Sequence, residues 1–324
     1  MVTRRRVVLA LGASALAPFA SFAQETKELT HLGYVSSIPD PYFEMFRQHM
    51  RELGYIDGSN IFFERRELEG RLDRIPALVR ELIQQKVRVL VAANNVAIEA
   101  AGKATATIPI VMIASIDPVA AGFVATLARP GGNITGIATL LRDLSAKRIE
   151  ILRELFPRLS RLAILWDVDG PGPKIAFNNY ENAARALKLR VQSLGIHGAK
   201  PELERAFRAA KTGGAEVIIV VANPTTFAHR VTVMNLSFKN RLPSMVENDA
   251  WVNDRALVSY GASMSEISQR IAVFVHRILK GAKPADLPVE QPTKYELVLN
   301  MKTAKALGIK IPQSILVRAD RVIE

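Results

Sequence analysis

Short apolar runs alternate with amphipathic segments along most of the chain. The runs at residues 87–92 and 108–113 are apolar apart from Arg88 near the start of the first, which is typical of parallel strands covered on both faces. Ahead of them, Phe43, Phe46 and Met50 recur at the spacing of one helix face. The first part of the chain therefore predicts the order β-α-β-α-β-α-β, with strands at residues 29–35, 61–63, 87–92 and 108–113.

The pattern restarts after a turn-forming Gly-Gly-Asn at residues 131–133. A connecting strand is expected at 134–138, with further strands at 162–166, 189–194, 217–221, 243–246 and 257–260. Helices are expected at about 145–156, 201–211 and 225–240, and a long amphipathic one along Ile267, Ile271, Phe274 and Ile278. Two βα series of similar size predict an α/β protein with two doubly wound parallel-sheet lobes. A cleft between such lobes is a favoured place for a small-molecule site.

The first 23 residues have the pattern of an export signal. Arg4, Arg5 and Arg6 precede a short apolar stretch, and small residues stand at positions 21 and 23, just before Gln24. The apolar stretch is too short and broken for a stable membrane span. Both a Sec signal and a twin-arginine signal fit this pattern. We expect cleavage near Ala23 and export to the periplasm.

The formal net charge of +12 first raises the question of a nucleic-acid partner. The signal contains three of the arginines and no acid, so 40 basic and 31 acidic groups remain in the mature chain, a net charge of +9. These charges are scattered and interleaved with acids, which is typical of solvated helix faces. No nucleic-acid-binding motif occurs, and we expect no nucleic-acid partner.

Motifs for catalysis are absent from the sequence. Zero Cys excludes disulfides, thiolate metal sites, a Cys nucleophile and a lipid-modified N-terminal Cys. None of the five His is paired at a metal-ligand spacing, and no nucleophile elbow, phosphate-binding loop or dinucleotide fingerprint occurs. We expect no metal, no cofactor and no catalytic residue, and hence a protein that is not an enzyme.

Two long motifs carry a family resemblance. Residues 117–136 read DPVAAGFVATLARPGGNITG, and residues 280–300 read KGAKPADLPVEQPTKYELVLN, continued by MKTAKALGI. Both resemble the substrate-binding proteins of ABC transporters, in a family associated with tryptophan or tyrosine uptake. The similarity extends from about His31 to Glu324.

The resemblance implies a type I periplasmic-binding-protein fold, in which two lobes joined by three crossovers close on ligand like a hinge. The crossovers are expected near residues 134–139, 257–262 and 290–298. After the signal at 1–23, the expected division places residues 28–136 with 262–290 in the first lobe and residues 137–261 with 291–324 in the second.

Candidate binding residues follow from the rule that ligands of open α/β sheets bind beyond the carboxyl ends of the strands. In the first lobe they are Ser36, Ser37, Asn94, Asn95, Ser115 and Asp117. Hydroxyls and a helix start at Asn94 suit an anionic ligand group, whereas Asp117 suits an ammonium. The alternative is purely structural: these residues cap the helices that follow them, and Asp117 is an N-cap before Pro118.

In the second lobe the candidates are Trp166, Asn223, Glu247 and Tyr260. Glu247 is the preferred acid, with a surface acid as the alternative. Trp166 suits stacking on a flat ligand or on a cation, or else belongs to the core. Tyr260 lies on an expected crossover, where it contacts ligand or packs at the hinge.

These observations predict a periplasmic solute-binding subunit of an ABC importer. We expect it to capture an amino-acid-like or aromatic solute between the lobes and to deliver it to a membrane permease, as a monomer. Two alternatives stay open: an exported α/β enzyme acting on a small molecule, and a ligand-sensing module for a membrane receptor.

Overall fold

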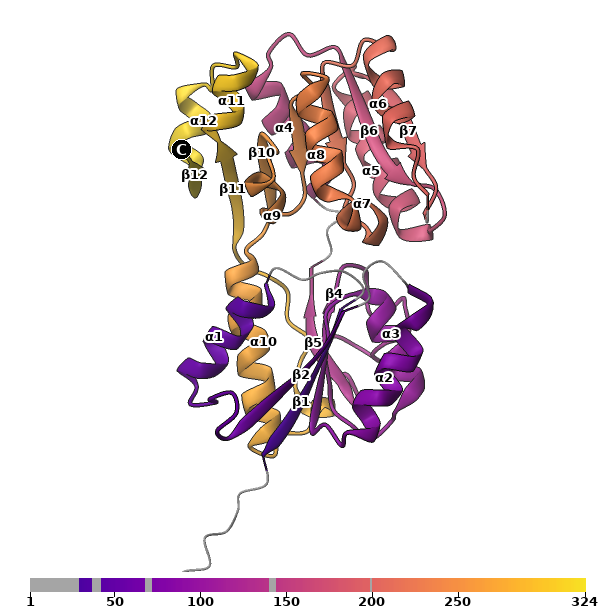
Figure 1. Cartoon of the computed structure of the whole chain (residues 1–324), viewed down its shortest axis with the longest axis vertical. Helices are drawn as coiled ribbons and strands as arrows, with labels where there is room; N and C mark the ends of the chain where they lie inside the picture. The colour runs from indigo at the N-terminus through magenta and orange to yellow at the C-terminus, as the bar shows by residue number, and fades with distance from the viewer. Residues whose placement is uncertain (1–28, 37–41, 68–71, 140–143, 199) are drawn as a thin grey trace, which may run out of the picture.

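Two lobes, one above the other, make up the computed structural model (Figure 1). It describes residues 29–36, 42–67, 72–139, 144–198 and 200–324. The expected export signal lies outside these ranges. Within them, no helix is both long and apolar enough to cross a membrane.

The first lobe is built on a five-stranded parallel sheet in the order β2-β1-β3-β4-β5. Its strands are β1 (Thr30–Ser36), β2 (Ile61–Glu67), β3 (Val89–Ala92), β4 (Ile110–Ala114) and β5 (Ile134–Ala138). The central strands β3 and β4 are buried almost throughout, as their continuous apolar runs predict. β5 runs two residues past the expected lobe boundary at 136.

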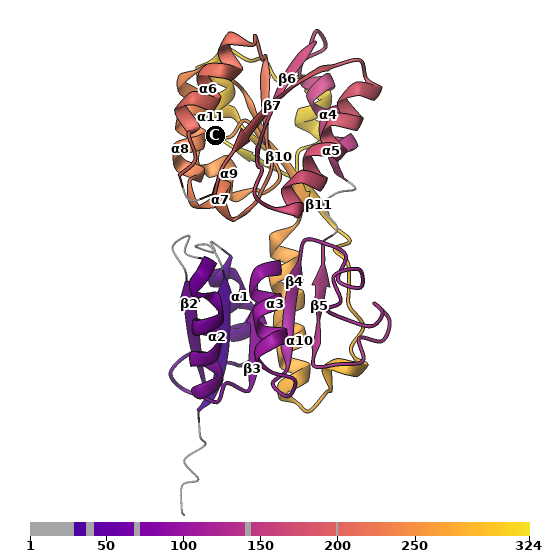
Figure 2. The same cartoon turned by 90° about the vertical axis from the view of Figure 1, so that its right-hand side faces the viewer.

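Helices cover both faces of this sheet (Figure 2). One face carries α1 (Phe43–Glu52) and α10 (Met264–Leu279), and the other carries α2 (Ile75–Gln84) and α3 (Asn95–Ala104), with short 3-10 turns at Leu72–Arg74 and Pro284–Asp286. Within β5, Gly136 has a φ of +136°, and a Cβ at this position would clash with the Met112 carbonyl oxygen on β4, so only glycine fits. This glycine therefore allows β5 to pair closely with β4.

The second lobe contains a seven-stranded sheet in the order β12-β11-β10-β9-β8-β6-β7. Its strands are β6 (Arg161–Asp167), β7 (Arg190–Ile196), β8 (Val217–Val220), β9 (Ser244–Val246), β10 (Val258–Ala262), β11 (Tyr295–Asn300) and β12 (Arg321–Ile323). The sheet is parallel except for β10 and β11, which pair antiparallel. The predicted parallel-sheet lobe is therefore confirmed, with one antiparallel pair that the sequence did not predict. This pair arises because β10 leaves for the first lobe at the end where β11 returns from it.

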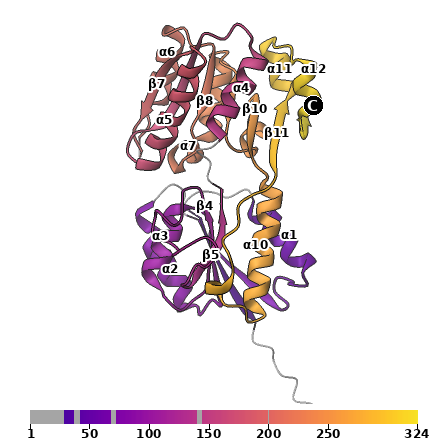
Figure 3. The ribbon, with the colours of Figure 1, turned by 180° about the vertical axis from the view of Figure 1, so that it is seen from behind.

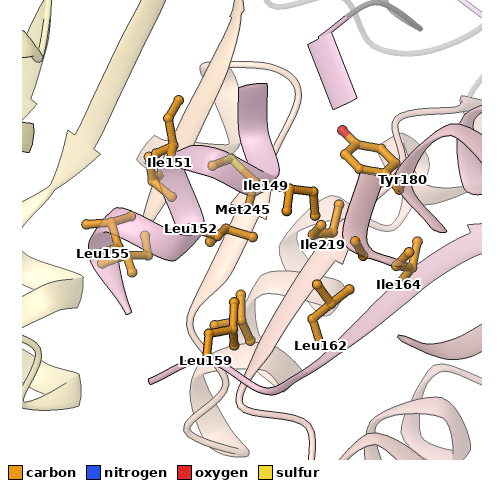
Figure 4. Close-up of a cluster of buried hydrophobic side chains, with 14 of the residues drawn as sticks. Ile149, Ile151, Leu152, Leu155, Leu159, Leu162, Ile164, Tyr180, Ile219 and Met245 are labelled. Carbon is orange, nitrogen blue, oxygen red and sulfur yellow. The ribbon is translucent and has the colours of Figure 1, made fainter. Parts of the chain in front are cut away.

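Two apolar cores cover the faces of this sheet. Figure 4 shows part of the core formed with α4 (Ser145–Leu155) and α5 (Pro171–Ala186), where Ile149, Leu152 and Ile219 are among the labelled side chains. The helices α11 (Met301–Leu307) and α12 (Gln313–Arg318) complete that face. The opposite face carries α6 (Leu203–Thr212), α7 (Pro224–Ala228), α8 (Arg230–Lys239) and α9 (Ala250–Asn253).

Two helix predictions in this lobe need correction. The single helix expected at about 225–240 is two helices that meet at His229, which ends α7 and begins α8. The helix expected from Pro201 begins at Leu203 instead, so Pro201 lies just ahead of it. The short elements α11, α12 and β12 were not predicted.

The chain passes between the lobes three times: from β5 to α4, from β10 to α10, and from Glu290 to β11. The last two passages run side by side (Figure 3), and the Ser263 amide donates to the Lys294 carbonyl at 2.9 Å. The predicted fold class, two α/β lobes joined by three crossovers, is confirmed.

Glu266, in the first turn of α10, holds the third crossover. It accepts hydrogen bonds from the Thr293 hydroxyl at 2.5 Å and from the Lys294 amide at 2.9 Å. Burial raises the pKa of Glu266, but these hydrogen bonds outweigh it and leave the pKa below its ordinary value. The ionised carboxylate therefore stabilises the crossover above its ordinary pKa, and this contribution is lost as the pH falls through the lowered one.

We expect Glu266→Gln to lower the free energy of unfolding by about 1 kcal/mol at neutral pH, because a charged acceptor of several hydrogen bonds is lost. The difference should shrink as the pH falls through the lowered pKa of Glu266, because Glu266 then becomes protonated in the wild type too. Thermal unfolding of both proteins across this range measures it, with Glu99→Gln, which removes an exposed α3 ion pair with Lys103, as the control. A deficit that does not change with pH would contradict the assignment.

Candidate functional site

A cavity of about 160 Å³ lies where the two lobes face each other, at the carboxyl ends of the strands. A volume of this kind holds on the order of ten water molecules, or a small organic molecule. The first lobe contributes Tyr34, Ser36, Tyr42, Phe46, Ala93, Asn94, Ile113, Ser115, Thr139, Met264, Ile267, Ser268 and Ile271. Ala262 follows from the end of β10, and the second lobe adds Ala222, Phe227, Glu247 and Asn248.

Aromatic and aliphatic side chains form most of the wall. Tyr34 on β1 lies 5.7 Å from Phe46 on α1, measured between ring centroids. Ile267 and Ile271, one turn apart on α10, add an aliphatic surface. Tyr42, just before α1, adds a third ring from the first lobe, and Phe227 on α7 adds a fourth from the second lobe. Such a wall suits a flat apolar group.

The polar end in the first lobe is the start of α3. The Asn94 Oδ1 caps this helix by accepting from the Ala97 amide at 3.0 Å. The Asn94 Nδ2 is buried and has no hydrogen-bond partner among the described residues. Since the first amides of a helix also have no partner within it, this end of the cavity offers donors and a positive dipole to an anionic group.

Asn95 supports this arrangement from behind. Its Nδ2 donates to the Ser115 hydroxyl at 2.8 Å, and its Oδ1 accepts from the Ser115 amide at 3.0 Å. The pair ties the end of β4 to the start of α3, and Ser115 itself lines the cavity.

The acid of the cavity is Glu247, which follows β9 and is 8% exposed. Its Oε1 accepts from the Tyr180 hydroxyl at 2.6 Å and from the Arg148 Nη1 at 3.1 Å. Its Oε2 accepts from the Ala222 amide at 2.8 Å. A carboxylate oxygen accepts more than one hydrogen bond, so Oε2 retains capacity for a ligand donor.

Arg148, on α4, is wholly buried behind Glu247. Its Nε donates to the Tyr260 carbonyl at 2.7 Å, and its Nη1 donates to the Tyr180 hydroxyl at 2.8 Å. Burial raises the pKa of Tyr180 well above its usual range, so its phenol stays protonated. Arg148 thus neutralises Glu247 and joins it to the strand that leads into the second crossover.

Of the residues predicted from strand ends, the structure brings Ser36, Asn94, Ser115 and Glu247 together around the cavity. Asn95 lies directly behind them. Ser37 lies outside the described residues.

The remaining four predicted residues do not line the cavity, and two of them cap turns. The Asp117 Oδ1 accepts from the Val119 amide at 2.9 Å and the Ala120 amide at 3.2 Å, so it caps the segment after it as the alternative raised above predicts, although that segment is a turn and not a helix. The Asn223 Oδ1 accepts from the Thr226 amide at 3.0 Å and forms a capping box on α7. These side chains position loops at the rim of the cleft.

Trp166 and Tyr260 pack in the second lobe. Trp166 stacks on Phe177 with ring centroids 4.7 Å apart, and its Nε1 donates to the Ser193 hydroxyl at 2.9 Å. Tyr260 packs against the core that includes Ile149 and Leu152, and its carbonyl accepts a hydrogen bond from the Arg148 Nε.

The strand-end rule missed the aromatic wall, because Tyr34 lies inside a strand and Phe46 inside a helix. It also missed Arg148, although a signal was present. Arg148 shares a helix face with Leu152 and Leu155 at 4 and 7 residues, so a charge stands on an apolar stripe.

A second hollow of about 270 Å³ runs along β7 and α6. It involves only the second lobe, and Arg205 and Glu202 on its rim already pair with each other at 2.9 Å. Across the ranges that the structure describes, no three His, Asp or Glu side chains cluster so as to hold a metal ion. The cavity between the lobes is therefore the candidate site.

Comparison with known proteins identifies the family and the fold. The family model for ABC transporter substrate binding proteins matches residues 42–323. A tyrosine-binding protein of Clostridioides difficile is 23% identical over 290 residues, which cover 88% of this chain and 83% of that protein.

Two solved structures share the fold. A domain from Streptococcus pneumoniae in complex with L-Trp gives a TM-score of 0.81 at 23% identity, covering 91% of this chain and 100% of that one. The ligand-free, open structure of a Clostridium difficile substrate binding protein with adhesive properties gives 0.65 at 21% identity, covering 91% and 99%. The resemblance seen in the two sequence motifs is confirmed, and the chain belongs to the family of ABC transporter substrate binding proteins.

Proposed function

We propose that this protein is the solute-binding subunit of an ABC importer and that it captures an aromatic amino acid between its lobes. One observation carries the proposal: a single cavity combines an aromatic wall, a buried carboxylate and the start of a helix. These three features match the side chain, the ammonium and the carboxylate of such a ligand.

The ammonium would bind at Glu247 Oε2, where one protein amide already donates and an acceptor position remains. The ligand carboxylate would bind at the start of α3, beside the Asn94 Nδ2 that has no protein partner in the described part of the chain. The aromatic ring would lie among Tyr34, Phe46 and Phe227.

Charge balance supports a zwitterion over a cation or an anion. Glu247 is the one charged side chain among the described residues that line the cavity, and Arg148 behind it carries the compensating charge. A ligand with a net charge would enter a desolvated site without a counter-charge, which costs free energy. A ligand with one ammonium and one carboxylate adds no net charge.

The relatives support the same ligand class, since one is named a tyrosine-binding protein and another was solved with L-Trp. Family membership supports a role beside a membrane permease, and the N-terminal signal pattern supports export to the periplasm. Binding and presentation require no covalent chemistry.

Thermal unfolding in the presence of single amino acids tests the proposal. L-Tryptophan or L-tyrosine should raise the melting temperature by several degrees, because a ligand at about 100 times its Kd adds about 2.7 kcal/mol of stability. L-Lysine and L-glutamate, which carry a net charge, should raise it far less. If none of the amino acids or aromatic acids raises it, this ligand class is wrong.

A further inference from the structure

A hydrogen-bonded contact joins the two lobes at the cavity, apart from the three crossovers. Tyr42 immediately precedes α1 in the first lobe, and its hydroxyl contacts the Asn248 Oδ1 and donates to the Asp249 Oδ1 at 2.6 Å. It also accepts from the Ala250 amide at 3.2 Å. These partners lie more than 200 residues away in the chain, at the start of α9 in the second lobe.

The second-lobe side of this contact is held in place by its own lobe. The Asn248 Oδ1 accepts from the Ala250 amide at 3.1 Å, and the Asp249 Oδ2 accepts from the Arg321 Nη2 on β12 at 2.7 Å. Because both partners are already positioned, little conformational entropy is lost when the Tyr42 hydroxyl reaches them.

The contact is also part of the cavity wall. Tyr42 and Asn248 both line the cavity, one from each lobe. The Tyr42 ring is buried, at 8% exposure, so its hydroxyl is presented to the other lobe from a fixed position. Separating the lobes at this point breaks these hydrogen bonds and opens the cavity in the same movement.

We propose that Tyr42, Asn248 and Asp249 form a cross-lobe latch, in which Tyr42 is a positioning residue that holds the lobes closed and slows the release of ligand. The effect of the latch on ligand release rests on the proposed function. Its effect on the separation of the lobes does not. A hydrogen bond to a charged acceptor contributes mainly to the lifetime of a closed complex, so its loss should act on the dissociation rate.

Stopped-flow measurement of L-tryptophan or L-tyrosine release tests whether the latch slows the release of ligand. Tyr42→Phe keeps the ring in the wall and removes the hydroxyl, and should raise the dissociation rate about tenfold while the association rate changes far less. Asp249→Ala removes a latch partner that does not line the cavity and should act in the same direction. Release at the wild-type rate in both variants would overturn the proposal.

Tyr55→Phe is the matched control, since the Tyr55 hydroxyl contacts His276 Nδ1 at 3.1 Å within the first lobe and is remote from the cavity. It removes a phenol hydroxyl without touching the latch, and should release ligand at the wild-type rate. An equal acceleration in this variant would assign the effect to general loosening of the first lobe and overturn the latch.

A second measurement needs no ligand. The chain has no Cys, so Lys103→Cys on α3 and Arg205→Cys on α6 introduce one unique exposed label site in each lobe. Pulsed electron paramagnetic resonance then gives the distance distribution between two spin labels. Tyr42→Phe should shift the distribution to longer distances than in the unmodified latch, and an unchanged distribution would overturn the proposal.

The two measurements separate the latch from the proposed function. If the distances lengthen but no aromatic amino acid binds the wild type, the latch stands and the ligand class is wrong. If the wild type binds and both distances and release rates are unaffected by Tyr42→Phe, the ligand class stands and the latch is wrong.

Discussion

Replacing Arg148 by methionine should lower the free energy of unfolding by about 3–5 kcal/mol. Arg148 is wholly buried, and its guanidinium faces Glu247, Tyr180 and the Tyr260 carbonyl. Removing it leaves the Glu247 carboxylate without its counter-charge and the Tyr260 carbonyl without this donor. Denaturant unfolding of the wild type and the variant measures the difference.

Arg153→Met provides the control on the same helix. The Arg153 Nη1 donates to one carbonyl, that of Leu159, at 2.8 Å, and Arg153 is half-buried. It should cost only about 1 kcal/mol. Equal losses in the two variants would mean that Arg148 acts as an ordinary helix residue and that the buried charge pair with Glu247 has no special role.

Replacing Glu247 by glutamine should weaken the binding of L-tryptophan or L-tyrosine about a hundredfold, because the ammonium loses a charge-assisted acceptor. An analogue such as indole-3-propionate keeps the ring and the carboxylate of tryptophan but lacks the amine. Its affinity should fall far less in Glu247→Gln. Calorimetric titration of both ligands against both proteins separates loss of the ammonium contact from general damage to the site.

Asp117→Asn is the matched acid control. Asp117 caps the turn after β4 and does not line the cavity, so this variant should bind the amino acid with wild-type affinity. Glu247→Gln losing both ligands equally would show that the carboxylate does not contact the ammonium. A large loss of affinity in Asp117→Asn would indicate that the ammonium binds in the first lobe instead.

The fold was predictable wherever local pattern and tertiary environment agree. The continuous apolar runs at β3 and β4 identify strands covered on both faces, because only such strands are apolar at every position. The antiparallel pairing of β11 was not predictable from its own residues, since it depends on where the chain returns from the other lobe. The break between α7 and α8 likewise leaves no proline or glycine to mark it.

The candidate site was predictable in part. The strand-end rule selected Glu247 and Asn94, because the topology of an α/β sheet brings strand ends to one edge. The same rule selected Asp117 and Asn223, which cap turns, because a capping residue and a ligand-binding residue have the same chemistry and the same position in sequence. Asn94 itself caps α3, so only the position of each side chain relative to the cavity distinguishes the two roles.

Contacts between distant segments were beyond sequence reasoning. Tyr42 and Asp249 are separated by 207 residues, and nothing in either local sequence points to the other. The burial of Arg148 was easier to predict, since its place on the apolar face of α4 indicates a buried charge that requires a partner. Its partner Glu247 was already a candidate, but the link between them is a tertiary fact.

We propose above all that the cavity between the lobes binds one aromatic amino acid through Glu247. Isothermal titration of the purified protein with L-tryptophan and L-tyrosine tests it most directly. We expect saturable binding of at least one of them with one ligand per chain, and about a hundredfold weaker binding in Glu247→Gln. Absence of binding by the wild type to both, or equal affinity in the wild type and Glu247→Gln, would contradict it.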